Sequence, residues 1–287
     1  MLTFAAYSNS FRSGFVLDNE GLLLQDPRIR EANAENIRLI LQHTYWWPYG
    51  ESGLYRPFAT LSYLFNYAVL GNGEHPEGYH WINLFLHMGN VLLVYALARR
   101  LLSEFWPPVF VAGLWAAHPV LTESVTNIVG RTDLLAAMAV LSGLLFYLKS
   151  MEATGARRWM WLAALMTVTF IGVFSKESAA VLLGVIVLYE LVWWKERQNA
   201  KGLLLGCAAI APPLLAMWRQ RSVVMAGASL SPFPFVDNPL VAADFWTARL
   251  TALKLIARYL GLLVWPAKLS ADYSYAEILL AHGSASD

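Results

Sequence analysis

Long apolar runs dominate the chain after residue 80 and constrain its fold more than any other feature of the sequence. A helix that crosses a bilayer core needs about 20 mostly apolar residues, with a range of roughly 17–25. Six runs come close to that length: residues 81–98, 105–122, 134–148, 159–175, 178–194 and 202–218. A seventh, at 250–265, is interrupted by Lys254 and Arg258. The sequence therefore predicts an all-α protein, a polytopic membrane helical bundle.

The composition excludes several other classes of protein. Hydrophobic residues make up 57% and charged residues 14% of the 287-residue chain, and the mean hydropathy is +0.45. Soluble domains carry roughly 25% charged residues, so an ordinary soluble enzyme and a disordered chain are excluded. The net charge of +1 provides no field that would hold a nucleic acid, so no such partner is expected. The single cysteine, Cys207, cannot form an internal disulfide.

Lysine and arginine gather in alternate connections between the runs. They form three basic clusters: Arg99 with Arg100, Lys149 with Arg157 and Arg158, and Lys195 with Arg197 and Lys201. An excess of these residues marks the cytoplasmic side of a membrane. We therefore expect the run at 81–98 to pass inward, and the following segments to face outward: 1–78, 119–133, 175–178 and 219–246.

The predicted organisation is a single membrane domain, 1–287. Its parts are a first extracytoplasmic loop at 8–78, six transmembrane helices within 79–218, and an outer loop plus a transmembrane or interfacial helix at 247–265 within 219–287. In the first loop, residues 35–45 read as a short amphipathic helix and 58–70 as a helix embedded in the outer leaflet or packed on the bundle. Residues 1–7 are too few to cross a bilayer. We expect a chain truncated at both ends that lacks most of a first membrane helix.

Acidic residues stand where the first outer loop begins. Asp18, Asn19 and Glu20 follow the apolar residues 15–17 directly. Two carboxylates two positions apart can share a metal ion or divide acid and base roles. An incidental acidic pair at the start of a loop is the alternative.

A second set of polar residues occupies the turn between the second and third runs. Pro119 ends a helix and leaves His118 at the water boundary, while Glu123 and Asn127 share one face if 121–128 is helical. Arg131 and Asp133 then open the next run. These residues are candidates for chemistry, and the alternative is helix capping with an arginine–carboxylate pair that stabilises the turn.

Three further polar groups lie at membrane depth. Lys176 and Glu177 join two runs almost without a loop, and the ammonium could either face a phosphate or extend to the interface. His80, Asn83 and His87 form a stripe along one helix face, for which hydrogen bonding between helices is favoured over a cofactor role, and no spacing resembles a zinc site. Lys254 and Arg258 share one face, where they would bind lipid phosphate or extend to the interface.

An ordered set of short motifs resembles one known family. The motifs are Phe15-Val16-Leu17-Asp18-Asn19, Tyr55-Arg56-Pro57, Gly78-Tyr79-His80-Trp81-Ile82-Asn83, Leu86-His87, Ala117-His118-Pro119, Thr122-Glu123, Gly130-Arg131-Thr132-Asp133-Leu134-Leu135, Ser175-Lys176-Glu177 and Leu269-Ser270-Ala271-Asp272-Tyr273-Ser274. Together they resemble the membrane portion of the transmembrane and tetratricopeptide-repeat O-mannosyltransferases and their bacterial relatives, which are GT-C glycosyltransferases. The resemblance covers about residues 9–275, and this chain contains no tetratricopeptide repeats.

The resemblance implies a GT-C-like fold and a glycosyltransferase that moves a mannose-like sugar from a polyprenyl-phosphate donor to a protein hydroxyl or another acceptor, protein or lipid, on the extracytoplasmic face. The family's catalytic base falls on Asp18, and the second acid that often follows it is replaced by Asn19, with Glu20 one position further on. The candidate catalytic residues are therefore Asp18 and Glu20. The candidate ligands of the donor phosphate are Arg56, Arg131, Lys176, Lys254 and Arg258. The candidates that orient substrates are His80, His118, Glu123, Asp133 and Glu177.

The remaining expectations concern cofactor, location and the competing function. Cations around a lipid phosphate can replace a metal, so no obligatory cofactor is predicted, although Asp18 and Glu20 keep a divalent cation possible. Short loops favour an integral protein of a bacterial inner membrane, with its active site facing outward and surrounded by membrane lipids. A transporter or flippase of lipid-linked sugars is the alternative, but such proteins often show paired broken helices, which this sequence lacks.

Overall fold

The secondary structure is helical throughout the part of the chain that the computed structural model describes, which comprises residues 1–49, 53–193, 200–228, 238–270, 273 and 277–281. Those residues contain no β-strand, so the prediction of an all-α fold is confirmed. Several residues used in the sequence analysis lie outside the described part: Trp194, Lys195, Arg197, Ala271, Asp272 and Ser274.

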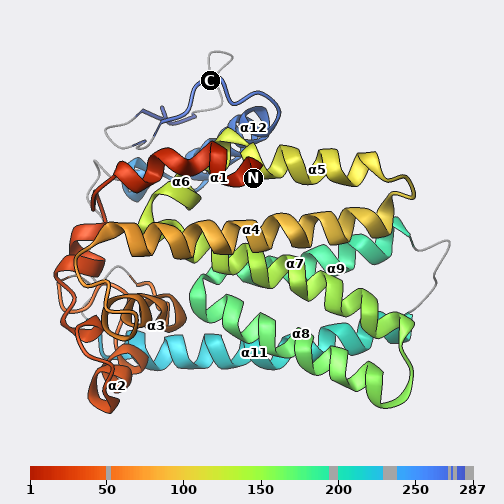
Figure 1. The fold of residues 1–287 in the computed structure, drawn as a ribbon, viewed down its shortest axis with the longest axis horizontal. Helices are drawn as coiled ribbons and strands as arrows, with labels where there is room; N and C mark the ends of the chain where they lie inside the picture. The colour runs from red at the N-terminus through yellow and green to blue at the C-terminus, as the bar shows by residue number, and fades with distance from the viewer. Residues whose placement is uncertain (50–52, 194–199, 229–237, 271–272, 274–276, 282–287) are drawn as a thin grey trace.

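Four helices are long and apolar enough to cross a membrane. They are α4 (Pro76–Leu101), α7 (Arg131–Glu152), α8 (Gly155–Ser175) and α11 (Ala200–Ala226). Figure 1 shows them stacked side by side, with α7 packed between α4 and α8 and with α11 against α8. The prediction of a polytopic membrane bundle is therefore confirmed.

The other predicted membrane segments form shorter or more polar helices. Helix α5 (Trp106–Ala117) is short because prolines flank it, at 107 and 108 in its first turn and at 119 just beyond its end. Helix α9 (Val181–Val192) also has 12 residues. Helix α12 (Phe245–Val264) has 20 residues but contains three cations, Arg249, Lys254 and Arg258. Whether these three cross a bilayer stays a prediction.

The two ends of the bundle differ in chemistry. The connections from α4 to α5 and from α7 to α8 lie at the right-hand end in Figure 1, and they carry Arg99, Arg100, Arg157 and Arg158. We call this the inner end. The opposite end, where α2 (Ala34–Gln42) and α3 (Pro57–Leu64) lie, is the outer end. These names follow the rule that an excess of lysine and arginine marks the cytoplasmic side of a membrane.

Close helix packing and apolar outer surfaces both fit a bilayer. A Cβ atom at Gly172 of α8 would lie 2.4 Å from the Cβ of Ala139, so only glycine allows α7 and α8 to approach this closely. On the surface of the bundle, the residues Leu92 of α4 and Leu204 of α11 are 67% and 69% exposed. In a membrane, such side chains contact hydrocarbon.

The polar stripe of α4 bonds to backbone where neighbouring helices are interrupted. Asn83 donates through Nδ2 to the carbonyls of Asn127 and Ile128, at 3.1 and 3.2 Å. The Nε2 of His87 lies 3.1 Å from the carbonyl of Ala116, and Nδ2 of Asn90 donates to the carbonyl of Leu134 at 3.0 Å. A backbone carbonyl at membrane depth needs a donor from the protein because the bilayer core holds no water that could donate to it. The favoured structural role of this stripe is confirmed.

Short helices fold the first outer loop into a compact cap. The segments are η1 (Ser8–Arg12), η2 (Glu20–Leu24), η3 (Pro27–Ile29), α2, α3 and η4 (Phe65–Val69), and they follow α1 (Leu2–Tyr7), which packs on α4 and α5. The predicted helix at 58–70 is confirmed as α3 and η4, and it packs on the bundle through Phe58, whose ring centre lies 5.7 and 6.2 Å from those of Phe170 and Phe174 of α8. The predicted helix at 35–45 is confirmed in part, since α2 ends at Gln42 and Tyr45 lies in the following irregular segment.

A buried ion pair supports that segment. Arg28 and Asp26 are each 1% exposed, and their closest nitrogen and oxygen atoms lie 2.7 Å apart. The same guanidinium donates to the carbonyls of Thr44 and Tyr45, at 2.9 and 3.0 Å. The pair therefore holds the backbone that positions the Tyr45 side chain.

We expect Arg28→Met to lower the free energy of unfolding by about 3–5 kcal/mol, because it leaves the Asp26 carboxylate buried without its counter-charge. Thermal unfolding in detergent micelles measures this loss as a fall in the midpoint. Glu74→Gln is the matched control, since Glu74 pairs with Arg30 at 3.4 Å near the surface and such pairs contribute about 1 kcal/mol or less. Equal midpoints for the two variants would contradict the structural role of Arg28.

Candidate active site

The candidate site lies at the outer end, where three segments of the chain meet. They are residues 13–18 of the first loop, the turn between α5 and α7, and the junction of α8 with η7 (Glu177–Ala180). The turn consists of η5 (Pro119–Leu121), α6 (Thr122–Thr126) and η6 (Ile128–Gly130). A Cβ atom at Gly130 would lie 2.7 Å from the carbonyl oxygens of both Glu123 and Ser124, so glycine lets the turn close tightly.

The first loop presents Asp18 through an unusual backbone conformation. Leu17 has φ +53°, and this left-handed conformation is costly for a leucine. On the other side of Asp18, the Asn19 side chain is buried and accepts a hydrogen bond from the backbone N–H of Val129, at 3.1 Å. Asp18 remains accessible to solvent, yet partial burial of its carboxyl raises its pKa above the usual range. The carboxyl is therefore both reachable and more basic than an ordinary aspartate.

Glu123 lies close enough to three other charged groups to interact with each. Burial raises the pKa of Glu123, and the carboxylate of Asp133 raises it further. The ammonium of Lys176 lowers this pKa, and the carboxylate of Asp18 raises it. Of the residues that the sequence nominated, Asp133 and Lys176 pair directly, and the charges of Asp133, Lys176 and Asp18 act on Glu123.

Two half-buried ion pairs border this group. Lys176 Nζ lies 2.5 Å from Asp133 Oδ1, and the two side chains are 25% and 44% exposed. Arg56 donates through Nε and Nη2 to Glu177 Oε2, at 3.1 Å for each contact. Both cations keep partial access to solvent, which a ligand phosphate would need.

A buried tyrosine lies beside the Arg56–Glu177 pair. The Arg56 guanidinium carbon lies 5.3 Å from the centre of the Tyr45 ring, and the hydroxyls of Tyr45 and Tyr63 lie 3.2 Å apart. Burial raises the pKa of Tyr45 above its usual range; the charge of Arg56 lowers it and that of Asp18 raises it. In the sequence, Tyr45 is only the last residue of the amphipathic helix predicted at 35–45, and no local signal indicates its contact with Arg56.

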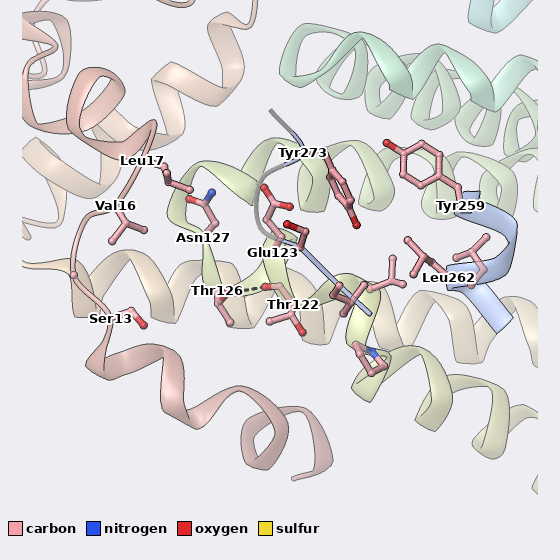
Figure 2. A pocket seen from close by; sticks show the side chains of 16 residues that line it. Ser13, Val16, Leu17, Thr122, Glu123, Thr126, Asn127, Tyr259, Leu262 and Tyr273 are labelled. Carbon is pink, nitrogen blue, oxygen red and sulfur yellow. Dashed lines mark hydrogen bonds between the residues drawn. The ribbon is translucent and has the colours of Figure 1, made fainter. Parts of the chain in front are cut away.

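Two cavities adjoin the group, and α6 contributes to both. We call the first the outer cavity; it measures about 570 Å³ and lies between the first loop, α6 and the end of α12. Figure 2 shows Glu123 and Asn127 facing it, with Leu17 on one side and Tyr259 and Leu262 on the other.

The second cavity, the membrane groove, measures about 340 Å³ and lies between α4, α5, α6, α7 and α9. Its lining includes Leu121, Ser124, Asp133, Ala137 and Val181. Two buried polar atoms of the groove residues, Trp115 Nε1 and Asn90 Oδ1, have no hydrogen-bond partner among the described residues. The groove is therefore mostly apolar but offers a donor and an acceptor near the Lys176–Asp133 pair.

Arg131 and His80 lie beneath the site rather than in it. Arg131 is 0% exposed, and its three guanidinium nitrogens donate to Asn83 Oδ1 and to the carbonyls of Ser62 and Tyr79. These bonds use three of its five N–H donors, and complete burial keeps the guanidinium out of reach of a phosphate. His80 is 2% exposed and its Nε2 lies 3.1 Å from the carbonyl of Ser13. Both residues stabilise the site from below.

Four other nominated residues are also placed apart from the charged group. Glu20 is exposed and begins η2. His118 bonds to the backbone N–H of Val120 and lies 3.1 Å from the carbonyl of Leu263, so it joins the turn to α12. Lys254 donates to the carbonyl of Leu279, and Arg258 pairs with Glu277 at 3.8 Å. The last two therefore hold the segment 277–281 against α12.

Among the residues that the structure describes, no three His, Cys, Asp or Glu side chains cluster so that they could hold a metal ion.

Comparisons with known proteins give the chain a family context. A family model described as "Protein O-mannosyl-transferase TMTC, DUF1736" matches residues 227–284. The chain is 32% identical over 280 residues to the protein O-mannosyl-transferase Tmtc2 of Drosophila melanogaster. This alignment covers 95% of this chain and 29% of the relative. The chain is thus similar in sequence to part of the TMTC protein O-mannosyl-transferases. No solved structure matches it.

Other TMTC proteins agree with this relationship. The mouse TMTC2 is 31% identical over 299 residues, and the human TMTC3 is 25% identical over 299 residues. These alignments cover 95% and 96% of this chain, and 34% and 32% of the relatives. The chain thus spans about a third of the length of these curated relatives. They come from animals, so the comparisons do not support the bacterial origin that we expected.

Part of the segment that matches the family model lines the outer cavity. Six described residues of 227–284 do so: Tyr259, Leu262, Leu263, Leu269, Ser270 and Tyr273. They line the same cavity as Glu123.

Proposed function

We propose that this chain is the membrane part of a GT-C-like glycosyltransferase that moves a mannose-like sugar from a polyprenyl-phosphate donor to a protein hydroxyl. One observation carries the proposal: Glu123 and Leu17, the neighbour of Asp18, line the outer cavity, while Asp133, paired with Lys176 at 2.5 Å, lines the adjoining membrane groove. An acceptor protein approaches from water and a lipid donor from the bilayer, so the reaction needs such a junction. The outer end is then the extracytoplasmic face.

Asp18 is the proposed general base. The acceptor hydroxyl oxygen forms a bond to the anomeric carbon, and the bond from that carbon to the phosphate oxygen breaks. The hydroxyl proton passes to the Asp18 carboxylate, and polyprenyl phosphate leaves with the bonding electrons. A carboxylate of raised pKa is the better proton acceptor.

Lys176 and Arg56 are the proposed cations for the leaving phosphate. Negative charge grows on the phosphate in the transition state, and fixed cations stabilise it there. Asp133 and Glu177 hold the two cations in place through their ion pairs. The donor chain lies in the membrane groove, where its apolar surface meets residues such as Leu121 and Val181.

The proposed reaction has no obligatory metal, because two protein cations balance the phosphate charge. Activity is therefore expected to persist in a chelator of divalent ions. Loss of activity that Mn²⁺ or Mg²⁺ restores would instead assign a cation to the acidic residues of the site.

The transfer rate is expected to rise with pH as Asp18 loses its proton, because only the carboxylate accepts the hydroxyl proton. An ordinary aspartate has a pKa of about 3.9. Burial raises the pKa of Asp18, so the rise in transfer rate is expected at a higher pH than this. The pH profile of the transfer rate gives the midpoint of this rise. A midpoint at or below the pKa of an ordinary aspartate would contradict the effect of burial on Asp18.

The test separates transfer from transport, the alternative function. The chain is reconstituted in vesicles with a labelled polyprenyl-phosphate mannose and a peptide rich in serine and threonine. Covalent label on the peptide supports the proposal. Donor that moves unchanged between leaflets, with an unlabelled peptide, would replace it with a transporter or flippase.

A further inference from the structure

A third cavity lies at the inner end, far along the bundle from the candidate active site. It measures about 230 Å³ and lies where α7 ends, α8 begins and α4 approaches its last turn. Its lining residues are Arg100, Lys149, Glu152, Ala153, Arg157 and Trp161. Three cations and one acid give this small space a net positive charge.

The shape of the cavity depends on contacts among these residues. Arg100 donates to both carboxylate oxygens of Glu152, at 2.6 and 3.2 Å. Lys149 Nζ lies 4.5 Å from the centre of the Trp161 ring, which stacks on Phe146 with 5.5 Å between centroids. Arg158 donates through Nε to the carbonyl of Ala153, at 3.0 Å, and so closes the connection between α7 and α8. The cations therefore surround a floor that is partly aromatic.

The position of this cavity distinguishes it from an ordinary basic surface. It opens at the ends of three membrane-length helices, α4, α7 and α8, and the ends of such helices reach the level of the phospholipid headgroups in a bilayer. Tryptophan rings and cations are typical of this interface, and basic pockets between membrane helices on the cytoplasmic side bind anionic headgroups. Cations that only set the orientation of the chain in the membrane would not need to line a cavity.

We propose that this inner-end cavity binds the phosphate headgroup of an anionic phospholipid, with Lys149 and Arg157 as its ligands. Arg100 contributes positive charge while Glu152 holds it in place, and Trp161 contacts the lipid where its chains begin. The occupant is a lipid rather than free phosphate because the aromatic floor offers apolar contact that an inorganic ion would not use. The site is independent of the proposed glycosyl transfer.

Native mass spectrometry tests this proposal on the full chain, released from nanodiscs of phosphatidylglycerol or of phosphatidylcholine. The unmodified chain should retain phosphatidylglycerol in preference to phosphatidylcholine. Arg157→Gln and Lys149→Gln should each reduce the retained phosphatidylglycerol about fivefold, since one cation near the membrane surface contributes roughly 1 kcal/mol. Arg99→Gln is the matched control: Arg99 neighbours Arg100 but bonds to the carbonyl of Glu104, and retention should not change.

Three outcomes would overturn the proposal. Equal retention of the two lipids would exclude an anionic site. An equal loss in Arg99→Gln would mean that the general field of the inner end, and not the cavity, attracts the lipid. Displacement of phosphatidylglycerol by millimolar inorganic phosphate would make the site one for a free anion. Unchanged melting of each variant in detergent shows that a loss of lipid does not come from unfolding.

Discussion

Asp18→Asn is expected to reduce the rate of sugar transfer by about 10²–10⁴-fold, the usual contribution of a positioned general base. Asparagine keeps the size and polarity of the side chain but cannot accept the hydroxyl proton. Because Asp18 lies in an accessible loop and Asn19 supplies the contact to Val129, the fold should persist. The measurement is the initial rate of label transfer from polyprenyl-phosphate mannose to a peptide, with donor binding measured separately. Binding should change little.

Glu20→Gln is the matched control for this change. Glu20 is also acidic and exposed in the same loop, but it begins η2 and is not among the charged groups that act on Glu123. We expect its transfer rate to stay within about twofold of the unmodified chain, a difference that corresponds to surface effects below about 0.5 kcal/mol. A full rate in Asp18→Asn, or a large loss in Glu20→Gln, would move the base away from Asp18.

Lys176→Gln is expected to lower the transfer rate by roughly 10²–10³-fold, the usual effect of removing one group that stabilises transition-state charge. The change removes the cation beside Asp133 and leaves the carboxylate of Asp133 facing the phosphate. Lys176→Arg should restore part of the rate, because it returns the charge with a different geometry. The separate values of kcat and KM show whether the loss lies in the transition state or in donor binding.

Lys254→Gln provides the comparison at a second lysine. The sequence nominated Lys254 for the same role, but it donates to the carbonyl of Leu279 and supports the segment 277–281. Its loss should change the transfer rate by no more than about threefold, as for an exposed polar contact. A larger effect at Lys254 than at Lys176 would place the phosphate near α12 instead.

The membrane fold was predictable because its signals are local. Apolar runs define the long helices, Pro119 ends α5, and the polar face of α4 follows from the spacing of His80, Asn83 and His87. The nomination of Asp18 came from the family resemblance, since an acidic pair at the start of a loop is weak on its own. Its proximity to Glu123 depends on the contact between Asn19 and Val129, which are 110 residues apart.

The roles of the arginines were not predictable for the same reason. In the sequence, Arg131 looks like an available phosphate ligand. Its partners Asn83, Ser62 and Tyr79 are not evident there because they lie 48 to 69 residues away in the chain. Only the fold shows that those partners use its donors. Conversely, Asp26 and Arg28 read as ordinary loop charges, yet burial makes them a structural pair. Charge type is visible in a sequence, whereas burial and partner are set by the tertiary structure.

The central claim is that a lipid donor lies in the membrane groove with its phosphate at Lys176. The most direct test is the attachment site of a polyprenyl-phosphate mannose analogue that carries a photoreactive group in its first isoprene unit. The account predicts attachment to peptides that contain Leu121, Ala137 or Val181, and its suppression by unlabelled donor. Attachment confined to lipid-facing residues such as Leu92 and Leu204, or unchanged by unlabelled donor, would contradict it.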